Sequence, residues 1–190
     1  MKFYYPEPDI IERARNVKLL MLDVDGVLTD GQLYFSEHGE TLKAFNTLDG
    51  QGIKLLQLQG ICVGIVSGRQ SAALKLRADA LGITLMAQGR EDKFIALQEL
   101  LATHPYSLDE IAYAGDDLPD LLIMTRIGLP IAVPDAHESI HRHAALCTTR
   151  RGGHGAVRDI ADFLLQAQGK YERALQPFIG GANADLRTAD

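Results

Sequence analysis

Residues 17–26 read Val17-Lys18-Leu19-Leu20-Met21-Leu22-Asp23-Val24-Asp25-Gly26. An apolar run of this length that ends in acidic residues and a glycine is typical of a buried strand of a parallel sheet that enters a loop. Asp23 and Asp25 are two positions apart, so an extended backbone points both carboxylates to the same side. The stretch therefore predicts a central strand that delivers two carboxylates to one edge of a sheet.

The rest of the chain alternates short apolar runs with segments of helical periodicity. This alternation predicts an α/β fold: a single doubly wound, Rossmann-like parallel sheet with helices on both faces. Residues 31–46 read as an inserted β-hairpin, and the segment from Asp25 to Ser67 is too short for a cap domain. Strands are expected at 17–22, 61–66, 83–87, 111–114, 130–133 and 146–148, and helices at 9–15, 52–59, 71–81, 92–103, 119–125, 136–143 and 155–168. We expect one domain over residues 1–179 and a disordered tail over residues 180–190.

Composition limits the possible functions. The 190 residues carry a formal net charge of −6 and show no basic run of the kind that binds nucleic acid. No apolar stretch is long enough to cross a bilayer, and residues 1–12 lack the apolar segment of a signal peptide. Cys62 and Cys147 are expected to be reduced, structural thiols, with Cys62 buried in its strand. We therefore expect a cytoplasmic protein with no nucleic-acid or membrane partner.

Four groups of polar residues follow predicted strands or begin a helix. They are Asp23-Val24-Asp25-Gly26, Ser67-Gly68-Arg69, Lys93, and Gly115-Asp116-Asp117-Leu118-Pro119-Asp120. Ligands of an open parallel sheet bind outside the carboxyl ends of its strands, so these groups are expected to converge. Asp23, Asp25 and Asp116 would then repel one another unless a cation lies between them, and Mg²⁺ suits a site of few carboxylate ligands. Ser67 and Lys93 add a hydrogen-bond donor and a positive charge for a phosphoryl group.

The order of these groups resembles the four motifs of the haloacid dehalogenase superfamily. The resemblance implies that Asp23 is a nucleophile that forms an aspartyl-phosphate. It implies that Asp25 protonates the leaving oxygen and then activates water, while Ser67 and Lys93 bind the phosphoryl group. Val27 stands where many members carry threonine, which removes one phosphate donor without affecting the nucleophile.

The same resemblance implies a metal site. Mg²⁺ would be held by Asp23, the backbone carbonyl of Asp25, and Asp116. Asp117 and Asp120 would hold these ligands in place without binding the metal themselves.

Longer stretches resemble the capless phosphatases of 3-deoxy-D-manno-octulosonate 8-phosphate (KDO 8-phosphate). The matching stretches include Leu22–Gly31, Lys43-Ala44-Phe45-Asn46, Asp49-Gly50-x-Gly52, Val133-Pro134-Asp135-Ala136 and Gly152-Gly153-x-Gly155-Ala156-Val157-Arg158. The resemblance implies an Mg²⁺-dependent phosphatase that releases KDO and phosphate in lipopolysaccharide biosynthesis, and that forms a homotetramer. Phosphatases of related nonulosonate 9-phosphates carry the same catalytic residues and remain an alternative. By position, the implied substrate contacts are Asn46, Asp49, Gly50, Lys54, Gly68, Arg69, Arg77 and Lys93.

A second alternative comes from another class. His137-Glu138-Ser139-Ile140-His141 has the spacing of a zinc-hydrolase signature, with Glu172 as a distant third ligand. Against it, the predicted helix has only two turns, and surface histidines are the default interpretation.

Two apolar sets have no evident partner in the sheet. One lies on the hairpin (Leu33, Phe35, Leu42 and Phe45), and the other lies after Gln168 (Tyr171, Leu175, Phe178 and Ile179). Apolar groups of this kind are typical of interfaces. We expect hairpins packed together in the tetramer, with tails reaching toward neighbouring sites.

Overall fold

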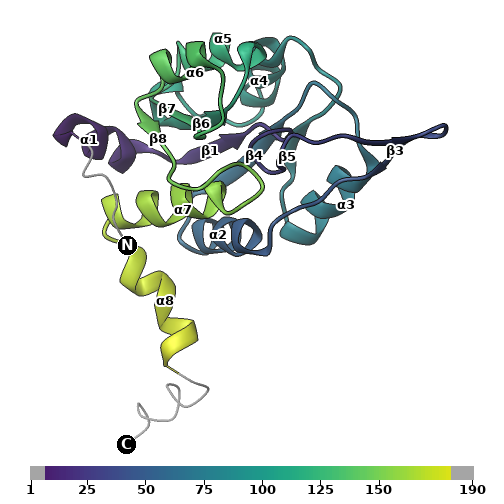
Figure 1. The fold of residues 1–190 in the computed structure, drawn as a ribbon. Helices are drawn as coiled ribbons and strands as arrows, with labels where there is room; N and C mark the ends of the chain where they lie inside the picture. The colour runs from purple at the N-terminus through teal and green to yellow at the C-terminus, as the bar shows by residue number, and fades with distance from the viewer. Residues whose placement is uncertain (1–6, 181–190) are drawn as a thin grey trace, which may run out of the picture.

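The computed structural model describes residues 7–180, and a six-stranded parallel sheet lies at their centre (Figure 1). The sheet has the order β5-β4-β1-β6-β7-β8, so the chain adds strands first to one side of β1 and then to the other. This reversal creates the crevice in which doubly wound folds bind ligands. The strands are β1 (Leu19–Leu22), β4 (Cys62–Val66), β5 (Leu85–Ala87), β6 (Ile111–Gly115), β7 (Leu129–Ala132) and β8 (Leu146–Cys147). The predicted doubly wound sheet is confirmed.

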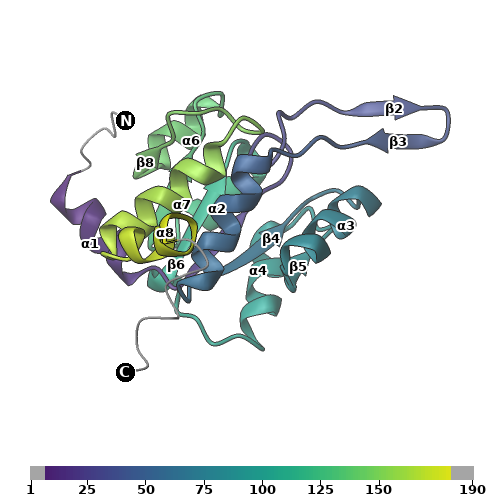
Figure 2. The same cartoon turned by 90° about the horizontal axis from the view of Figure 1, so that it is seen from below.

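Helices cover both faces of the sheet (Figures 1 and 2). Leu20 and Leu22 of β1 belong to one apolar core, and Leu19 and Met21 belong to the other. This two-sided burial explains why the strand reads as one unbroken apolar run. One face carries α1 (Pro8–Asn16), α2 (Thr47–Leu58), α3 (Ala72–Leu81) and α7 (Ala156–Ala167), and the other carries α4 (Lys93–Leu101), α5 (Leu121–Met124) and α6 (Glu138–His143). Two 3₁₀ turns, Leu108–Glu110 and Leu118–Asp120, complete the second side.

Capping residues fix the ends of the helices. The Ser71 side chain accepts the Leu74 N–H at 3.3 Å and so begins α3, and Gly82, with φ of +69°, ends it. The helix expected at residue 52 begins earlier, at Thr47, because the Asn46 side chain caps it by accepting the Leu48 N–H at 2.8 Å. The strand-to-helix alternation is therefore correct, and the boundaries move to where a cap lies.

The inserted hairpin projects away from the sheet (Figure 2). Its strands are β2 (Tyr34–Ser36) and β3 (Gly39–Leu42), and no further domain lies over the sheet in residues 7–180. Phe35 pairs with Glu40 and Tyr34 with Leu42, which leaves Thr41 without an opposite residue. This irregularity is a β-bulge, a feature that changes the direction of the side chains that follow it.

The hairpin exposes most of its apolar side chains. Leu33, Phe35 and Leu42 are 41%, 60% and 54% exposed. Phe45 differs, because it packs against the core beside α2. The expectation that Phe45 belongs to an exposed apolar set is therefore wrong.

The chain after residue 168 forms a further helix, α8 (Tyr171–Ile179), for which the sequence pattern gave no prediction. Ala174 is buried, and Tyr171 packs against the core next to α7. Phe178 and Ile179 remain exposed. Of the tail expected to be disordered, residues 181–190 lie outside the described residues.

The two cysteines are free. Cys62 is half-buried and not fully buried as predicted, since it is the first residue of β4, and Cys147 is exposed. Between residues 7 and 180, no helix is both long and apolar enough to span a membrane.

Candidate active site

The four polar groups converge at the carboxyl end of the sheet. Asp23 directly follows β1, Ser67 follows β4, Asp116 follows β6, and Lys93 is the first residue of α4. They surround a cleft of about 790 Å³. Its lining consists of Asp23, Asp25, Gly31, Leu33, Ser67, Gly68, Arg69, Glu91, Lys93, Asp116, Asp117 and Pro119. The convergence expected from the strand ends is present in the structure.

Lys93 forms two buried ion pairs at the base of the cleft. Its Nζ lies 2.8 Å from Asp23 Oδ1 and 2.7 Å from Asp120 Oδ1. Burial alone would lower the pKa of Lys93, but the charges of Asp23 and Asp120 outweigh it and raise that pKa. Lys93 therefore stays an ammonium beside the nucleophile predicted from the sequence.

Asp120 is fully occupied by hydrogen bonds. Tyr113 Oη donates to Asp120 Oδ1 at 2.6 Å, beside the bond from Lys93. The backbone N–H groups of Asp116 and Asp117 donate to Oδ2 at 3.0 and 3.2 Å. Asp120 lies close enough to Asp23 and Asp116 to share a metal with them, but four donors already use the four lone-pair sites of its carboxylate. Asp120 therefore orients Lys93 and the loop after β6, and Asp23 and Asp116 are left as the metal ligands of this group.

Tyr113 was not among the candidate site residues. It lies within β6 and is completely buried. Burial raises its pKa well above the ordinary value, and the charge of Asp120 raises it further, so the phenol keeps its proton and donates. The one sequence signal was a tyrosine inside an otherwise small and apolar strand, since a buried hydroxyl needs a partner.

Asp116 has the character of a metal ligand. Burial and the charge of Asp120 raise its pKa to about 6, and its Oδ1 is buried without a hydrogen-bond partner in the described residues. Its Oδ2 packs so closely on Gly26 that a Cβ there would lie 2.0 Å away; Gly26 also has a φ of +95°. Burial also raises the pKa of Asp23 well above normal. One ammonium among three carboxylates leaves excess negative charge, and an oxygen-only donor set fits Mg²⁺.

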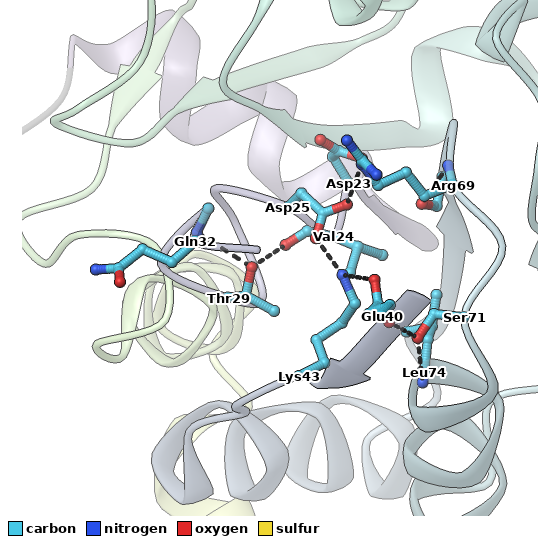
Figure 3. Close-up of polar contacts among 12 residues, drawn as sticks. Asp23, Val24, Asp25, Thr29, Gln32, Glu40, Lys43, Arg69, Ser71 and Leu74 are labelled. Carbon is cyan, nitrogen blue, oxygen red and sulfur yellow. Dashed lines mark hydrogen bonds and ion pairs between the residues drawn. The ribbon is translucent and has the colours of Figure 1, made fainter. Parts of the chain in front are cut away.

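Asp25 also lines the cleft. Figure 3 shows its side chain between those of Lys43 and Arg69. Its Oδ1 forms an ion pair with Lys43 Nζ, and its Oδ2 lies 3.8 Å from Arg69 Nε. Lys43 lies on the hairpin. The sequence indicated it only as part of a stretch that matches the family, and its contact with Asp25 was not predicted. Ser67 is buried and lines the cleft, and its Oγ accepts the Arg69 N–H at 3.2 Å.

Comparison with known proteins identifies the family. A model of haloacid dehalogenase-like hydrolases matches residues 83–160. A KDO 8-phosphate phosphatase of Yersinia pestis is 48% identical over 166 residues, which cover 87% of this chain and 89% of the relative. That of Escherichia coli K12 is 45% identical over 87% of this chain and 88% of its own length. The chain is a member of the KDO 8-phosphate phosphatase family. The motif-based assignment is confirmed.

A solved structure in this family is closely similar. The KDO 8-phosphate phosphatase of Moraxella catarrhalis, in complex with a magnesium ion, a phosphate ion and a KDO molecule, is 39% identical, with a TM-score of 0.86. The match covers 90% of this chain and 98% of that chain. The family fold therefore extends over nearly the whole described chain.

The candidate substrate contacts fall into two groups. Gly68, Arg69 and Lys93 line the cleft. Asn46 and Arg77 lie instead beside a pocket of about 10 Å³ between α2 and α3, where Arg77 Nη2 donates to the Asn46 carbonyl at 3.4 Å. Lys54 is exposed on α2. Substrate contacts from all six of these residues stay a prediction.

Asp49 and Gly50 have structural positions. Asp49 is 1% exposed, and its Oδ1 accepts the Arg158 N–H at 2.9 Å. Gly50 is buried so close to Arg77 that a Cβ would lie 2.2 Å from its Nη2. These contacts favour a structural role, although both residues line the same small pocket as Asn46 and Arg77. A substrate contact from Asp49 or Gly50 stays a prediction.

Within the described residues, the structure does not bring together the zinc site of the second alternative. His137 precedes α6 and is not on it, and its Nδ1 accepts the Ser139 N–H at 3.1 Å. In the part of the chain that the structure describes, the only group of three potential ligand side chains is Asp23, Asp116 and Asp120. His137 and His141 are exposed, as surface histidines should be.

Proposed function

We propose that this chain hydrolyses KDO 8-phosphate to KDO and phosphate through an aspartyl-phosphate on Asp23, in lipopolysaccharide biosynthesis. The observation that carries the proposal is the buried pair of Asp23 and Lys93 close to Asp116, whose Oδ1 is buried without a partner in the described residues. The chain that holds this site is 48% identical to a KDO 8-phosphate phosphatase. Asp23, the backbone carbonyl of Asp25, and Asp116 would hold Mg²⁺. When bound, the ion offsets the repulsion between a carboxylate nucleophile and an anionic phosphate.

The protein's own residues divide the reaction into two steps. In the first, an Asp23 oxygen forms a bond to phosphorus and the bond to the sugar oxygen breaks, while Asp25 gives its proton to that oxygen. In the second, Asp25 takes a proton from water, and the water oxygen attacks phosphorus and releases Asp23. Lys93 and the Ser67 hydroxyl stabilise the phosphoryl oxygens throughout.

Arg69 suits the rest of a sugar-acid phosphate. It lines the cleft and its side chain is 48% exposed, so it is open to a substrate carboxylate. A nonulosonate 9-phosphate presents the same two anionic groups one carbon further apart. The preference of the enzyme between these two substrates therefore has to be measured.

The assembly that we propose is a homotetramer acting in the cytoplasm. The exposed side chains of Leu33, Phe35 and Leu42 on the hairpin, and of Phe178 and Ile179 on α8, support a self-association that covers them. The resemblance supplies the number four.

Phosphate release from a series of sugar-acid phosphates tests the activity. KDO 8-phosphate should give the highest kcat/KM, and chelation should abolish turnover until Mg²⁺ is restored. Asp23→Asn should lower kcat on the order of 10⁴-fold or more, the scale seen when a covalent nucleophile is removed. Asp79→Asn on the exposed surface of α3 is the matched control. Wild-type turnover by Asp23→Asn, or no trapped phosphoenzyme, would refute the mechanism.

A further inference from the structure

We propose that the β2–β3 hairpin belongs to the catalytic apparatus, and that Lys43 is the positioning residue that holds Asp25 in the orientation needed for proton transfer. The proposal rests on the function proposed above for Asp25. It adds a residue that acts through Asp25 and does not touch the phosphoryl group.

Lys43 is buried although the hairpin that carries it is exposed. Its side chain is only 2% exposed, against 60% for Phe35 on the same hairpin. The ammonium pairs with Asp25 Oδ1 and lies 3.4 Å from Glu40 Oε2 (Figure 3). A buried ammonium is costly unless it is paired, so these two carboxylates fix its place.

Glu40 is itself anchored to the body of the domain. Ser71 Oγ donates to Glu40 Oε1 at 2.5 Å, and Ser71 is the N-cap of α3. Asp25, Lys43, Glu40 and Ser71 therefore form one chain of contacts (Figure 3). It joins the loop after β1, the hairpin, and the start of the helix that follows β4.

The bulge at Thr41 makes this chain possible. In a regular strand, residues three positions apart point to opposite faces. Thr41 has no opposite residue in the β2–β3 pairing, and Lys43 lies one residue beyond the end of β3, so the regular alternation is broken between Glu40 and Lys43. The two side chains can therefore meet, with Lys43 Nζ 3.4 Å from Glu40 Oε2. Bulges commonly direct a side chain toward a functional site, and here the side chain is Lys43.

The geometry separates the two oxygens of Asp25. Lys43 occupies Oδ1, while Oδ2 lies on the side of Arg69, a residue that lines the cleft. Lys43 is not among the residues that line the cleft. It therefore acts on the substrate only through the carboxyl that it holds, and a proton donor and acceptor works only if it is correctly placed.

The two aspartates of the first motif thus each have a buried lysine. Lys93 pairs with Asp23, and Lys43 pairs with Asp25. Lys93 belongs to α4, a helix that packs on the sheet, and Lys43 belongs to the inserted hairpin. A purely structural pair would tie the hairpin down without affecting proton transfer, and the two roles differ in a measurable way.

The experiment compares two leaving groups in Lys43→Met. Protonation by Asp25 matters for the alkoxide of KDO 8-phosphate and little for the stable phenolate of 4-nitrophenyl phosphate. Lys43→Met should lower kcat for KDO 8-phosphate by about 10- to 100-fold, the scale of a misplaced catalytic group. The pre-steady-state burst of nitrophenolate should change by less than about 3-fold, and phosphoenzyme should then accumulate because water activation is also impaired.

Further variants make the result specific. Glu40→Gln, which leaves Lys43 in place, should give the same pattern by a smaller factor: a loss of kcat for KDO 8-phosphate and little change in the nitrophenolate burst. This variant keeps the test valid if Lys43→Met lowers Tm too far for the assay. In an Asp25→Asn background, Lys43→Met should cause no further loss, since the two residues act as one unit. Lys75→Met, which removes a surface lysine from α3, is the matched control.

An equal loss in the rate of phosphoenzyme formation from both substrates, no loss with either, or a further loss in the Asp25→Asn background would overturn the positioning role. Wild-type turnover of KDO 8-phosphate by Asp25→Asn alone is a different result, because it would remove the proposed function of Asp25 itself.

Discussion

Asp116 shows at the scale of one residue what the site requires. Its Oδ1 is buried without a partner in the described residues, and its pKa is about 6 because burial, followed by the charge of Asp120, disfavours the carboxylate. Between the ordinary value of 3.8 and about 6, the folded protein holds a proton that the unfolded chain has lost. Without metal, this group's contribution to stability therefore falls as pH rises through that window.

The raised pKa of Asp116 leads to a prediction about Mg²⁺ binding and pH. The ion needs the deprotonated carboxylate, so protons compete with it below about pH 6. At a fixed Mg²⁺ concentration, the rise in Tm on adding the ion should be larger well above pH 6 than well below it. Differential scanning calorimetry at the two pH values measures this.

Asp116→Asn supplies the control for the same measurement. It should lose most of the Mg²⁺-dependent rise in Tm and its dependence on pH, whereas Asp79→Asn on α3 should keep both. An equal rise in Tm at both pH values in the wild type would contradict the assignment of Asp116 as a ligand.

At the scale of the element, Asp49 connects two helices. The N-cap of α7 is Gly155, which has no side chain to cap the helix, and Asp49 of α2 supplies an oxygen to the Arg158 N–H instead. A carboxylate at a helix N-terminus is favoured both by the free N–H groups and by the helix dipole. Asp49 therefore stabilises the contact of α2 with α7.

Asp49→Ala should lower the free energy of unfolding by about 1–2 kcal/mol, the cost of losing a buried cap. For a domain of this size, Tm should fall by roughly 2–8 °C. Asp49→Asn keeps an acceptor and should cost less. Since Asp49 does not line the cleft, KM for the sugar phosphate should stay within about twofold of wild type. Unchanged melting with a strongly raised KM would instead support the predicted substrate contact of Asp49.

The elements also show which features a sequence can predict. Asp23, Ser67 and Asp116 end or follow apolar runs, so strand periodicity alone brings them to one edge. The contact between Lys43 and Asp25 depends on the bulge at Thr41, which shifts the strand's alternation and has no clear sequence signal.

Burial and late helices were harder to predict. Asp49 was assigned to substrate by its position in a motif, but its burial depends on how α7 packs against α2. Helix α8 was missed because Gly169 indicates a helix end and Pro177 is unfavourable inside a helix. Its stability comes from Tyr171 and Ala174 packing against the rest of the chain, which is tertiary information.

At the scale of the whole molecule, exposed apolar side chains gather in two places. The hairpin presents Leu33, Phe35 and Leu42, and α8 presents Phe178 and Ile179. Truncation after Gly169 would test the tail, but it would also remove Ala174 from the core and so confuse assembly with stability. Substitutions at exposed positions separate the two.

The prediction for assembly uses the double variant Phe35→Ser and Leu42→Ser. Both side chains are more than half exposed in one chain, so replacing them should change the stability of that chain by only about 0.5 kcal/mol each. If hairpins pack together in a tetramer, the loss of apolar contact should shift sedimentation toward smaller species. Turnover of KDO 8-phosphate should fall with it, because a cleft without a cap domain relies on neighbouring subunits to exclude water. Leu76→Ser, at a 71% exposed position on α3, should leave both unchanged. A wild-type chain that sediments as a fully active monomer would refute this assembly and leave the chemistry of Asp23 intact.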